Sequence, residues 1–134
     1  MQAAIRILLV DDEEDFVETL SKRLAKRGLS VLTALRGERA LELLDANPVD
    51  VVVLDVKMPG LDGLEVLKRV KAGHPRVEVV LLTGHADMDA AIQGMELGAF
   101  DYLMKPTSIE ELLYKIEDAH KKKLLREQQA GGRT

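Results

Sequence analysis

Hydrophobic residues along the chain are concentrated in short, nearly continuous runs separated by mixed segments. Four of these runs are rich in Val, Ile and Leu and do not alternate with polar residues, which is typical of strands buried on both faces of a parallel sheet. A fifth run mixes polar and apolar positions, as a strand at the edge of a sheet does. We therefore predict strands over residues 5–10, 31–34, 49–54, 77–82 and 100–105.

The segments between these runs have helical spacing, with apolar residues recurring every three or four positions as on the buried face of an amphipathic helix. Strand and helix thus alternate five times, which indicates an α/β fold with a single doubly wound parallel sheet and helices on both faces. The recurring residues are Phe16, Leu20 and Leu24; Leu41 and Leu44; Leu64, Leu67 and Val70; Met88, Ile92 and Met95; and Ile109, Leu112, Leu113 and Ile116.

Capping residues agree with these boundaries. Two helix starts have capping-box spacing, in which a Ser or Asp is followed three residues later by Glu. Glycines follow three helix ends, where a left-handed C-terminal cap is expected. The capping boxes are Asp62 with Glu65 and Ser108 with Glu111, and the glycines are Gly28, Gly73 and Gly98.

Composition narrows the class of protein. The 134 residues suit one domain, and with 46% hydrophobic and 3% aromatic residues its core is aliphatic. The absence of cysteine excludes disulfides and zinc-thiolate sites. No apolar stretch approaches the length of a membrane span, so we expect a cytoplasmic protein without membrane contact. The net charge of -4 and the scattered basic residues argue against direct nucleic-acid binding, and the run 121–123 of three lysines is expected to be a solvated helix end.

Polar side chains stand where the predicted strands end. Asp11 and Asp12 follow the first strand, Asp55 the third, Thr83 the fourth, and Lys105 ends the fifth. In a doubly wound sheet these ends meet at the edge where ligands bind. Three carboxylates so close together require a cation to stay ionised at neutral pH, and oxygen ligands favour Mg²⁺. A carboxylate beside Mg²⁺ can attack phosphorus, with the lysine and the hydroxyl holding the phosphoryl oxygens.

The acidic run that follows the first strand also has a purely structural interpretation. Acidic residues before a helix commonly cap its N-terminus or interact with its dipole. We assign Glu13, Glu14 and Asp15 to this role, as helix-start and surface residues. The functional interpretation of Asp11 and Asp12 depends on their convergence with polar residues from three other strands.

Four motifs occur in a characteristic order: LLVDDEEDF, DVVVLDVKMPGLDGLEVL, VVLLTGHAD and ELGAFDYLMKP. With them the sequence resembles the receiver (CheY-like) domain of two-component response regulators over residues 5 to about 120. The resemblance implies a flavodoxin-like (βα)5 domain with a parallel five-stranded sheet in the order 2-1-3-4-5. It also implies a phosphorylated signalling domain with Mg²⁺ as its cofactor, which catalyses only its own phosphotransfer and dephosphorylation.

The resemblance assigns a role to each polar residue at the strand ends. Asp55 is similar to the phosphoacceptor, which attacks the phosphohistidine of a sensor histidine kinase. The implied protein ligands of Mg²⁺ are Asp55, Asp12, Asp11 acting mainly through water, and the backbone carbonyl of Lys57.

Three further positions match residues that respond to the phosphoryl group. Thr83 resembles the hydroxyl that moves to hydrogen-bond the phosphoryl group, and Lys105 the lysine that forms an ion pair with it. Tyr102 fits the aromatic switch that turns inward when the threonine moves. The bond between Lys105 and Pro106 resembles the family's cis peptide bond.

The output of the switch is less defined by the sequence. We expect the fourth helix, fifth strand and fifth helix to form the output face. Gly94 lies inside that fourth helix, where glycine costs about 1 kcal/mol relative to alanine, so either the helix is loosely held or the glycine permits close packing. We expect a receiver domain over residues 1–122, and over residues 123–134 a helix end with a tail or truncated linker. The implied partners are the kinase and a downstream effector domain or protein, and a phosphorylation-dependent homodimer is left open.

Two other classes of protein place an acidic or phosphate-binding site at this edge. An Mg²⁺-dependent phosphohydrolase with an aspartyl nucleophile usually has a second Asp two residues later, where this chain has Lys57, and a cap domain for which there is no room. A flavodoxin-like FMN carrier has a phosphate loop rich in Ser, Thr and Gly after the first strand, where this chain has DDEED.

Overall fold

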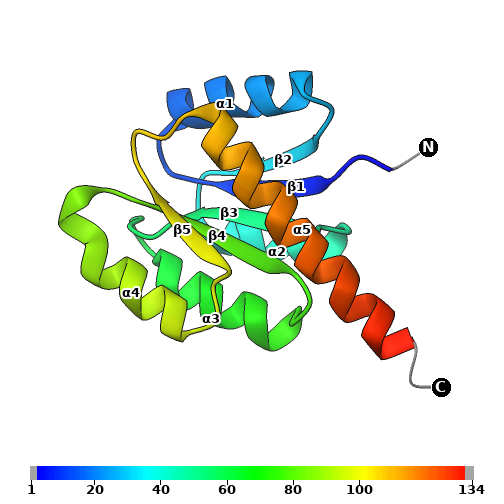
Figure 1. Ribbon diagram of the computed structural model, residues 1–134. Helices are drawn as coiled ribbons and strands as arrows, with labels where there is room; N and C mark the ends of the chain where they lie inside the picture. The colour runs from blue at the N-terminus through cyan, green and yellow to red at the C-terminus, as the bar shows by residue number, and fades with distance from the viewer. Residues whose placement is uncertain (1–2, 132–134) are drawn as a thin grey trace.

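Strands and helices alternate throughout the computed structural model, which describes residues 3–131 (Figure 1). Over this range the strands are β1 (Arg6–Val10), β2 (Ser30–Ala34), β3 (Val51–Asp55), β4 (Glu78–Thr83) and β5 (Asp101–Met104). The helices are α1 (Glu14–Lys26), α2 (Gly37–Ala46), α3 (Gly63–Gly73), α4 (Met88–Glu96) and α5 (Ile109–Gly131), and a short 3-10 helix, His85–Asp87, precedes α4. Each predicted strand and helix is present within a few residues of its expected bounds. None of the helices in the described range is long and apolar enough to cross a membrane.

The strands form one parallel sheet in the order β2-β1-β3-β4-β5, which confirms the predicted topology. Helices α1 and α5 pack on one face of the sheet, and α2, α3 and α4 on the other (Figure 1). Every residue of β3 and β4 is buried, because both faces of these central strands are covered. This double burial explains why their sequences are continuous apolar runs.

Most of the predicted caps are present. The Asp62 side chain accepts a hydrogen bond from the Glu65 amide at 3.0 Å, and the Ser108 hydroxyl accepts one from the Glu111 amide at 3.1 Å. Gly28 and Gly98 have the positive φ of left-handed caps, but Gly73 does not. The prediction for Gly73 was wrong because Gly73 is the last residue of α3, and the C-cap is His74, whose amide donates to the Val70 carbonyl.

Helix α4 faces the sheet through residues different from those that its apolar spacing suggested. Ala91 and Gly94 are buried, whereas Ile92 is 53% exposed and Met95 37% exposed. A Cβ atom added at Gly94 would lie 2.4 Å from a methyl carbon of Leu81. Gly94 therefore lets the helix approach β4 closely, which favours the packing interpretation of this glycine over that of a loosely held helix.

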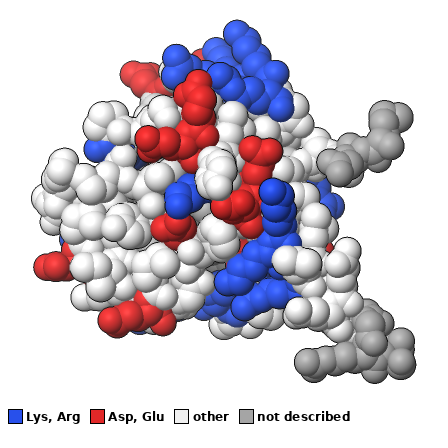
Figure 2. Space-filling view, in the orientation of Figure 1, with Lys and Arg blue, Asp and Glu red and all other residues white. Residues whose placement is uncertain are grey.

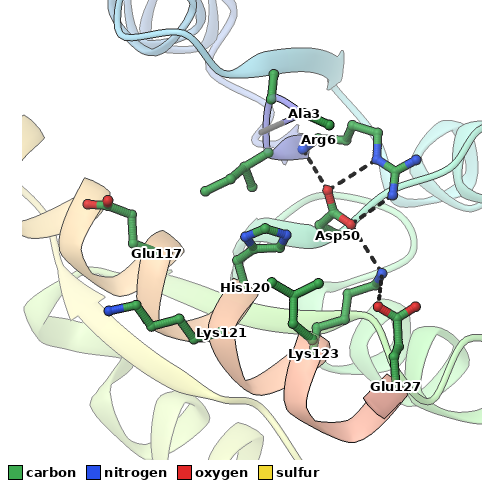
Figure 3. A pocket seen from close by; sticks show the side chains of 11 residues that line it. Ala3, Arg6, Asp50, Glu117, His120, Lys121, Lys123 and Glu127 are labelled. Atoms are coloured by element: carbon green, nitrogen blue, oxygen red, sulfur yellow. Dashed lines mark hydrogen bonds and ion pairs between the residues drawn. The ribbon is translucent and has the colours of Figure 1, made fainter. Parts of the chain in front are cut away.

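A second group of charges lies at the edge of the sheet where the strands begin, opposite the predicted functional edge. Asp50, directly before β3, is almost fully buried and pairs with Arg6 at 2.9 Å and with Lys123 at 3.1 Å (Figure 3). Glu78, the first residue of β4, is fully buried. Its carboxylate lies within 3.1 to 3.5 Å of Lys71, Lys122 and Arg126.

These ion pairs attach the C-terminal half of α5 to the sheet. Lys122 and Lys123 therefore contradict the expectation of a solvated helix end, because their ammonium groups neutralise buried carboxylates, while Lys121 is exposed as expected. Lysine and arginine side chains gather along α5 and over α1, with acidic side chains between them (Figure 2). This face of the molecule thus carries charges of both signs.

Helix α5 continues through Gly131, so residues 127–131 of the stretch EQQAGGRT are helical. Glu127 supports this extension through an ion pair with Lys123, one turn earlier. The remainder of the expected tail, residues 132–134, lies outside the described residues, as do residues 1–2 of the expected receiver domain.

Candidate functional site

The register of β1 and β3 brings the acidic residues together. Val10 lies opposite Leu54, so Asp11 and Asp55 occupy neighbouring positions at the carboxyl edge of the sheet. Carboxylate oxygens of Asp11, Asp12 and Asp55 all lie within 4.8 Å of one another. Asp11 is fully buried and Asp55 is 8% exposed, while Asp12 is exposed. These three acids form the acidic pocket, in which two of the carboxylates are buried and one is exposed.

Lys105 brings a positive charge to this pocket from the segment after β5. Its ammonium donates to Asp11 at 2.5 Å and to Glu13 at 3.2 Å, and lies 3.9 Å from Asp55. Its backbone amide donates to the Thr83 carbonyl at 2.7 Å, which fixes its position next to β4. The peptide bond between Lys105 and Pro106 is cis, as the family resemblance implied.

Burial and neighbouring charges change the acidity of both groups. Burial, followed by the Asp11 carboxylate, raises the pKa of Asp55 to about 6, although Lys105 and the Lys57 amide act in the opposite direction. Burial lowers the pKa of Lys105, but its hydrogen bond to Asp11 and the nearby carboxylates outweigh this effect and raise the pKa overall. Lys105 is thus charged at neutral pH, and Asp55 ionises near neutrality.

The remaining predicted site residues lie on β4, on β5 and in the loop after β3. Thr83 ends β4 and is fully buried, and its hydroxyl donates to the Gly84 carbonyl at 3.2 Å. Tyr102, in β5, is half-buried and packs against the apolar cluster on the α2, α3 and α4 side of the sheet. Lys57 lies in the loop after β3, where its amide donates to the Asp55 side chain at 3.4 Å.

The donor atoms of the pocket suit a divalent cation. Ionised Asp11, Asp12 and Asp55 carry three negative charges, and Lys105 supplies one positive charge, so an excess of two negative charges remains. All of the clustered side-chain donors are oxygens, which favours a hard ion of the Mg²⁺ type over zinc or copper. The acidic cluster therefore fits Mg²⁺ binding.

Two residues of this site were not predicted from the sequence. Glu13 was assigned to the helix start, and it does occupy the N-cap position of α1, but its side chain pairs with Lys105. Phe16 was assigned to the helix core, and its ring centroid lies 4.4 Å from the Lys105 ammonium. No local pattern in the sequence indicates either contact, because both residues are separated from Lys105 by about ninety positions.

Comparison with known proteins decides between the classes of function. The family model described as the response regulator receiver domain matches residues 7–117. The chain belongs to this family. A receiver domain is a signalling domain, and the phosphohydrolase and the flavin carrier that the sequence left as alternatives are accordingly set aside.

Curated relatives and solved structures agree with this assignment. The receiver is 41% identical to the DNA-binding transcriptional regulator NtrC of Escherichia coli (strain K12) over 119 residues, 89% of this chain and 25% of that protein. It is 41% identical to the response regulator MprA of Mycobacterium sp. (strain KMS) over 84% of this chain and 49% of MprA. The chain thus spans a quarter to a half of the length of these two relatives.

Two solved structures illustrate the similarity in three dimensions. A response regulator receiver domain protein from Clostridium thermocellum superposes with a TM-score of 0.87 and 38% identity, covering 90% of this chain and 98% of that one. NtrX from Brucella abortus gives a TM-score of 0.91 and 31% identity, covering 98% of this chain and 30% of NtrX. The receiver therefore has the fold of the phosphoacceptor switches of two-component systems.

Proposed function

We propose that Asp55 is the phosphoacceptor of this receiver and that Asp11, Asp12, Asp55 and the backbone carbonyl of Lys57 hold Mg²⁺. The observation that supports this assignment best is the position of Asp55. Its carboxylate is nearly buried, lies within 4.8 Å of two further carboxylates and is 3.9 Å from an ammonium group. A nucleophile in this environment is held beside the charges that a phosphoryl group requires.

The proposed reaction is phosphoryl transfer from a sensor histidine kinase. A carboxylate oxygen of Asp55 attacks the phosphorus of the kinase phosphohistidine, and an O–P bond forms as the P–N bond breaks. The imidazole nitrogen leaves with the electron pair of that bond. Lys105 pairs with the phosphoryl oxygens, and bound Mg²⁺ supplies further positive charge at the same place. Hydrolysis of the resulting acyl phosphate in the same pocket ends the signal.

The response to phosphorylation is proposed to begin at Thr83. Its hydroxyl contacts Gly84, so it would rotate to reach a phosphoryl group on Asp55. Tyr102, in the neighbouring strand, would then turn inward and change the face formed by α4, β5 and α5. Helix α4 carries the exposed apolar side chains of Ile92 and Met95, and α5 carries that of Tyr114. Exposed apolar side chains suit an effector domain, an effector protein or a second receiver as the partner.

The extent of the domain and its location are further predictions. We propose a receiver over residues 1–122, followed over residues 123–134 by a helix end with a tail or truncated linker. The end of the family match at residue 117, shortly before residue 123, supports this division. Membership of the family also favours a cytoplasmic location. We expect this domain to be activated by phosphorylation and to make no direct contact with nucleic acid or membrane.

Phosphorylation of purified protein tests the assignment of Asp55. Incubation with acetyl phosphate and Mg²⁺ should add one phosphoryl group to the intact mass, and chelation of Mg²⁺ should prevent this. Asp55→Asn should abolish the addition, whereas Asp15→Asn, which removes an exposed acid in the first turn of α1, should not. An unmodified wild type, or equal modification of the Asp55→Asn variant, would contradict the proposal.

Amide hydrogen exchange tests the proposed output face. Addition of beryllofluoride and Mg²⁺ should change the exchange of amides in α4 and β5 more than that of amides in α2. Tyr102→Ala should reduce this difference without preventing beryllofluoride binding. Equal changes in all three elements would contradict an output face at α4, β5 and α5.

A further inference from the structure

The Lys105 ammonium lies among three carboxylates and an aromatic ring. Asp11 accepts its hydrogen bond at 2.5 Å, Glu13 accepts one at 3.2 Å, and Asp55 lies at 3.9 Å. The ring centroid of Phe16 is 4.4 Å away. The lysine is therefore hydrogen-bonded to two acids other than the proposed phosphoacceptor.

The contact with Glu13 has no explanation in the fold. The Glu13 side chain is 66% exposed, and within residues 3–131 it makes no capping hydrogen bond to α1 although it occupies the N-cap position. Helix α1 is attached to the sheet by Val17 and Leu24, which are buried, so its position does not depend on Glu13. Apart from its ion pair with Lys105, the Glu13 carboxylate thus has no evident role in stabilising α1.

A phosphoryl group on Asp55 would compete with Asp11 and Glu13 for the Lys105 ammonium. At 3.9 Å from Asp55, its ammonium is within the range of an ion pair but beyond that of a hydrogen bond. A hydrogen bond from the ammonium to a phosphoryl oxygen would be made at the expense of its bond to the exposed Glu13 carboxylate, which is longer than its bond to Asp11. Phe16 occupies another side of the ammonium and attracts it through its ring, which favours the same position near α1.

We propose that Glu13 is a positioning residue that holds Lys105 on the α1 side of the pocket in the unphosphorylated receiver. Glu13 thereby competes with the phosphoryl group for the ammonium and limits the stability of the phosphorylated state. This inference rests on the proposed function of Asp55, because that proposal supplies the phosphoryl group. Glu13 would thus join the residues that set the equilibrium between the unphosphorylated and the phosphorylated conformation.

Replacement of Glu13 by Gln should release Lys105 and raise the affinity for beryllofluoride, which mimics the phosphoryl group on Asp55. The expected increase is about two- to fivefold, the range of a partly exposed ion pair. Removal of any nearby negative charge also favours an anion, so a matched control is required. Glu14→Gln removes the same charge from the next residue, which is exposed and makes no contact with Lys105 among the described residues. It should change the affinity by less than about 1.5-fold.

The test is a titration of beryllofluoride at fixed Mg²⁺, with binding followed by Tyr102 or backbone NMR resonances. The increase should occur in Glu13→Gln and vanish when Glu13→Gln is combined with Lys105→Met, as in a double-mutant cycle. Equal effects of Glu13→Gln and Glu14→Gln, or an effect that persists without Lys105, would overturn the inference. A wild type that does not bind beryllofluoride at all would overturn the proposed function itself.

A second measurement does not depend on the folding of the Lys105→Met variant. The ¹⁵N resonance of the Lys105 ammonium should shift on Glu13→Gln in the free receiver, because the contact exists in that state. It should be the same in both proteins after beryllofluoride binds, since Lys105 has then left Glu13. A shift of equal size in both states would mean that Glu13 does not hold the lysine back, and would contradict the inference.

Discussion

The ammonium of Lys105 donates to the fully buried carboxylate of Asp11 at 2.5 Å. Without Lys105, a buried negative charge would lose the cation nearest to it. Lys105→Met should therefore lower the free energy of unfolding by about 2 to 4 kcal/mol in the absence of divalent ions.

Chemical denaturation in EDTA and in Mg²⁺ checks this expectation. The loss should be smaller in Mg²⁺, because the bound ion replaces the missing positive charge. Lys68→Met is a suitable control, since Lys68 pairs with Glu65 at 3.9 Å on the surface, and its removal should cost less than about 1 kcal/mol. An equal decrease in the free energy of unfolding for both variants would show that the buried pair of Lys105 with Asp11 contributes no more than a surface ion pair.

The raised pKa of Asp55 predicts that this residue destabilises the metal-free protein. Its pKa rises from 3.8 to about 6 on folding, so ionising it at neutral pH costs more in the folded state than in the unfolded state. Asp55→Asn should raise the free energy of unfolding at pH 7 by about 1 to 3 kcal/mol.

The pH dependence of this effect has a definite sign. Below about pH 4 the Asp55 carboxyl is protonated in both states, so the variant and the wild type should have similar stability there. The difference should develop between about pH 4 and pH 6 and remain constant above it. Urea titrations in EDTA at several pH values provide the measurement, and a difference that is largest at low pH would contradict the sign.

The ion pairs of Asp50 predict a strong contribution from one of three consecutive lysines. Burial opposes ionisation of Asp50, but hydrogen bonds from Arg6 and the charge of Lys123 outweigh it and hold the pKa of Asp50 well below its usual range. Lys123→Met leaves the buried carboxylate with Arg6 alone, so it should reduce stability by about 2 to 4 kcal/mol.

Lys121→Met provides the matched control for this prediction. Lys121 is exposed and lies two residues away on the same helix, and its replacement should change stability by less than about 0.5 kcal/mol. Because the pKa of Asp50 is lowered, the contribution of the pair should be present at neutral pH and be lost as the pH falls below about 4. Similar stability of the two variants at pH 7 would contradict a role for the pair.

Gly94 and Gly73 should respond in opposite ways to the same substitution. Alanine favours a helix by about 1 kcal/mol over glycine. At Gly94, however, the alanine Cβ would lie 2.4 Å from a Leu81 side-chain carbon. Gly94→Ala should therefore lower the free energy of unfolding by about 1 to 3 kcal/mol. A Cβ at Gly73 would have no heavy atom within 4 Å, so Gly73→Ala should be neutral or stabilise by up to about 1 kcal/mol. Thermal unfolding of both variants distinguishes these outcomes, and a more stable Gly94→Ala protein would mean that α4 is not tightly packed on β4.

The topology and the place of the acidic pocket followed from local sequence patterns. Buried parallel strands read as continuous apolar runs, and the polar residue that follows each run lies at the same edge of the sheet. For this reason the sequence alone predicts that Asp11, Asp55 and Lys105 lie near one another. The precise assignment of strand order came from the family resemblance.

Contacts between distant residues could not be read from the same patterns. Asp50 and Glu78 stand at the starts of two buried strands, and nothing in their immediate sequence indicates that lysines on α5 neutralise them. Likewise, Ile92 has the spacing of a core residue, but the small residues Ala91 and Gly94 allow a closer approach to the sheet and turn Ile92 outward. In both cases tertiary packing overrides local periodicity.

Helix α5 has 23 residues and is therefore roughly 35 Å long. It starts four residues after Lys105, and just past its midpoint Lys122 pairs with Glu78 and Lys123 with Asp50. A helix that tilts near Lys105 also moves Lys122 and Lys123 relative to the buried carboxylates at the opposite edge of the sheet. The strength of those distant pairs thus sets how stiffly the receiver resists the displacement that phosphorylation would impose on this helix.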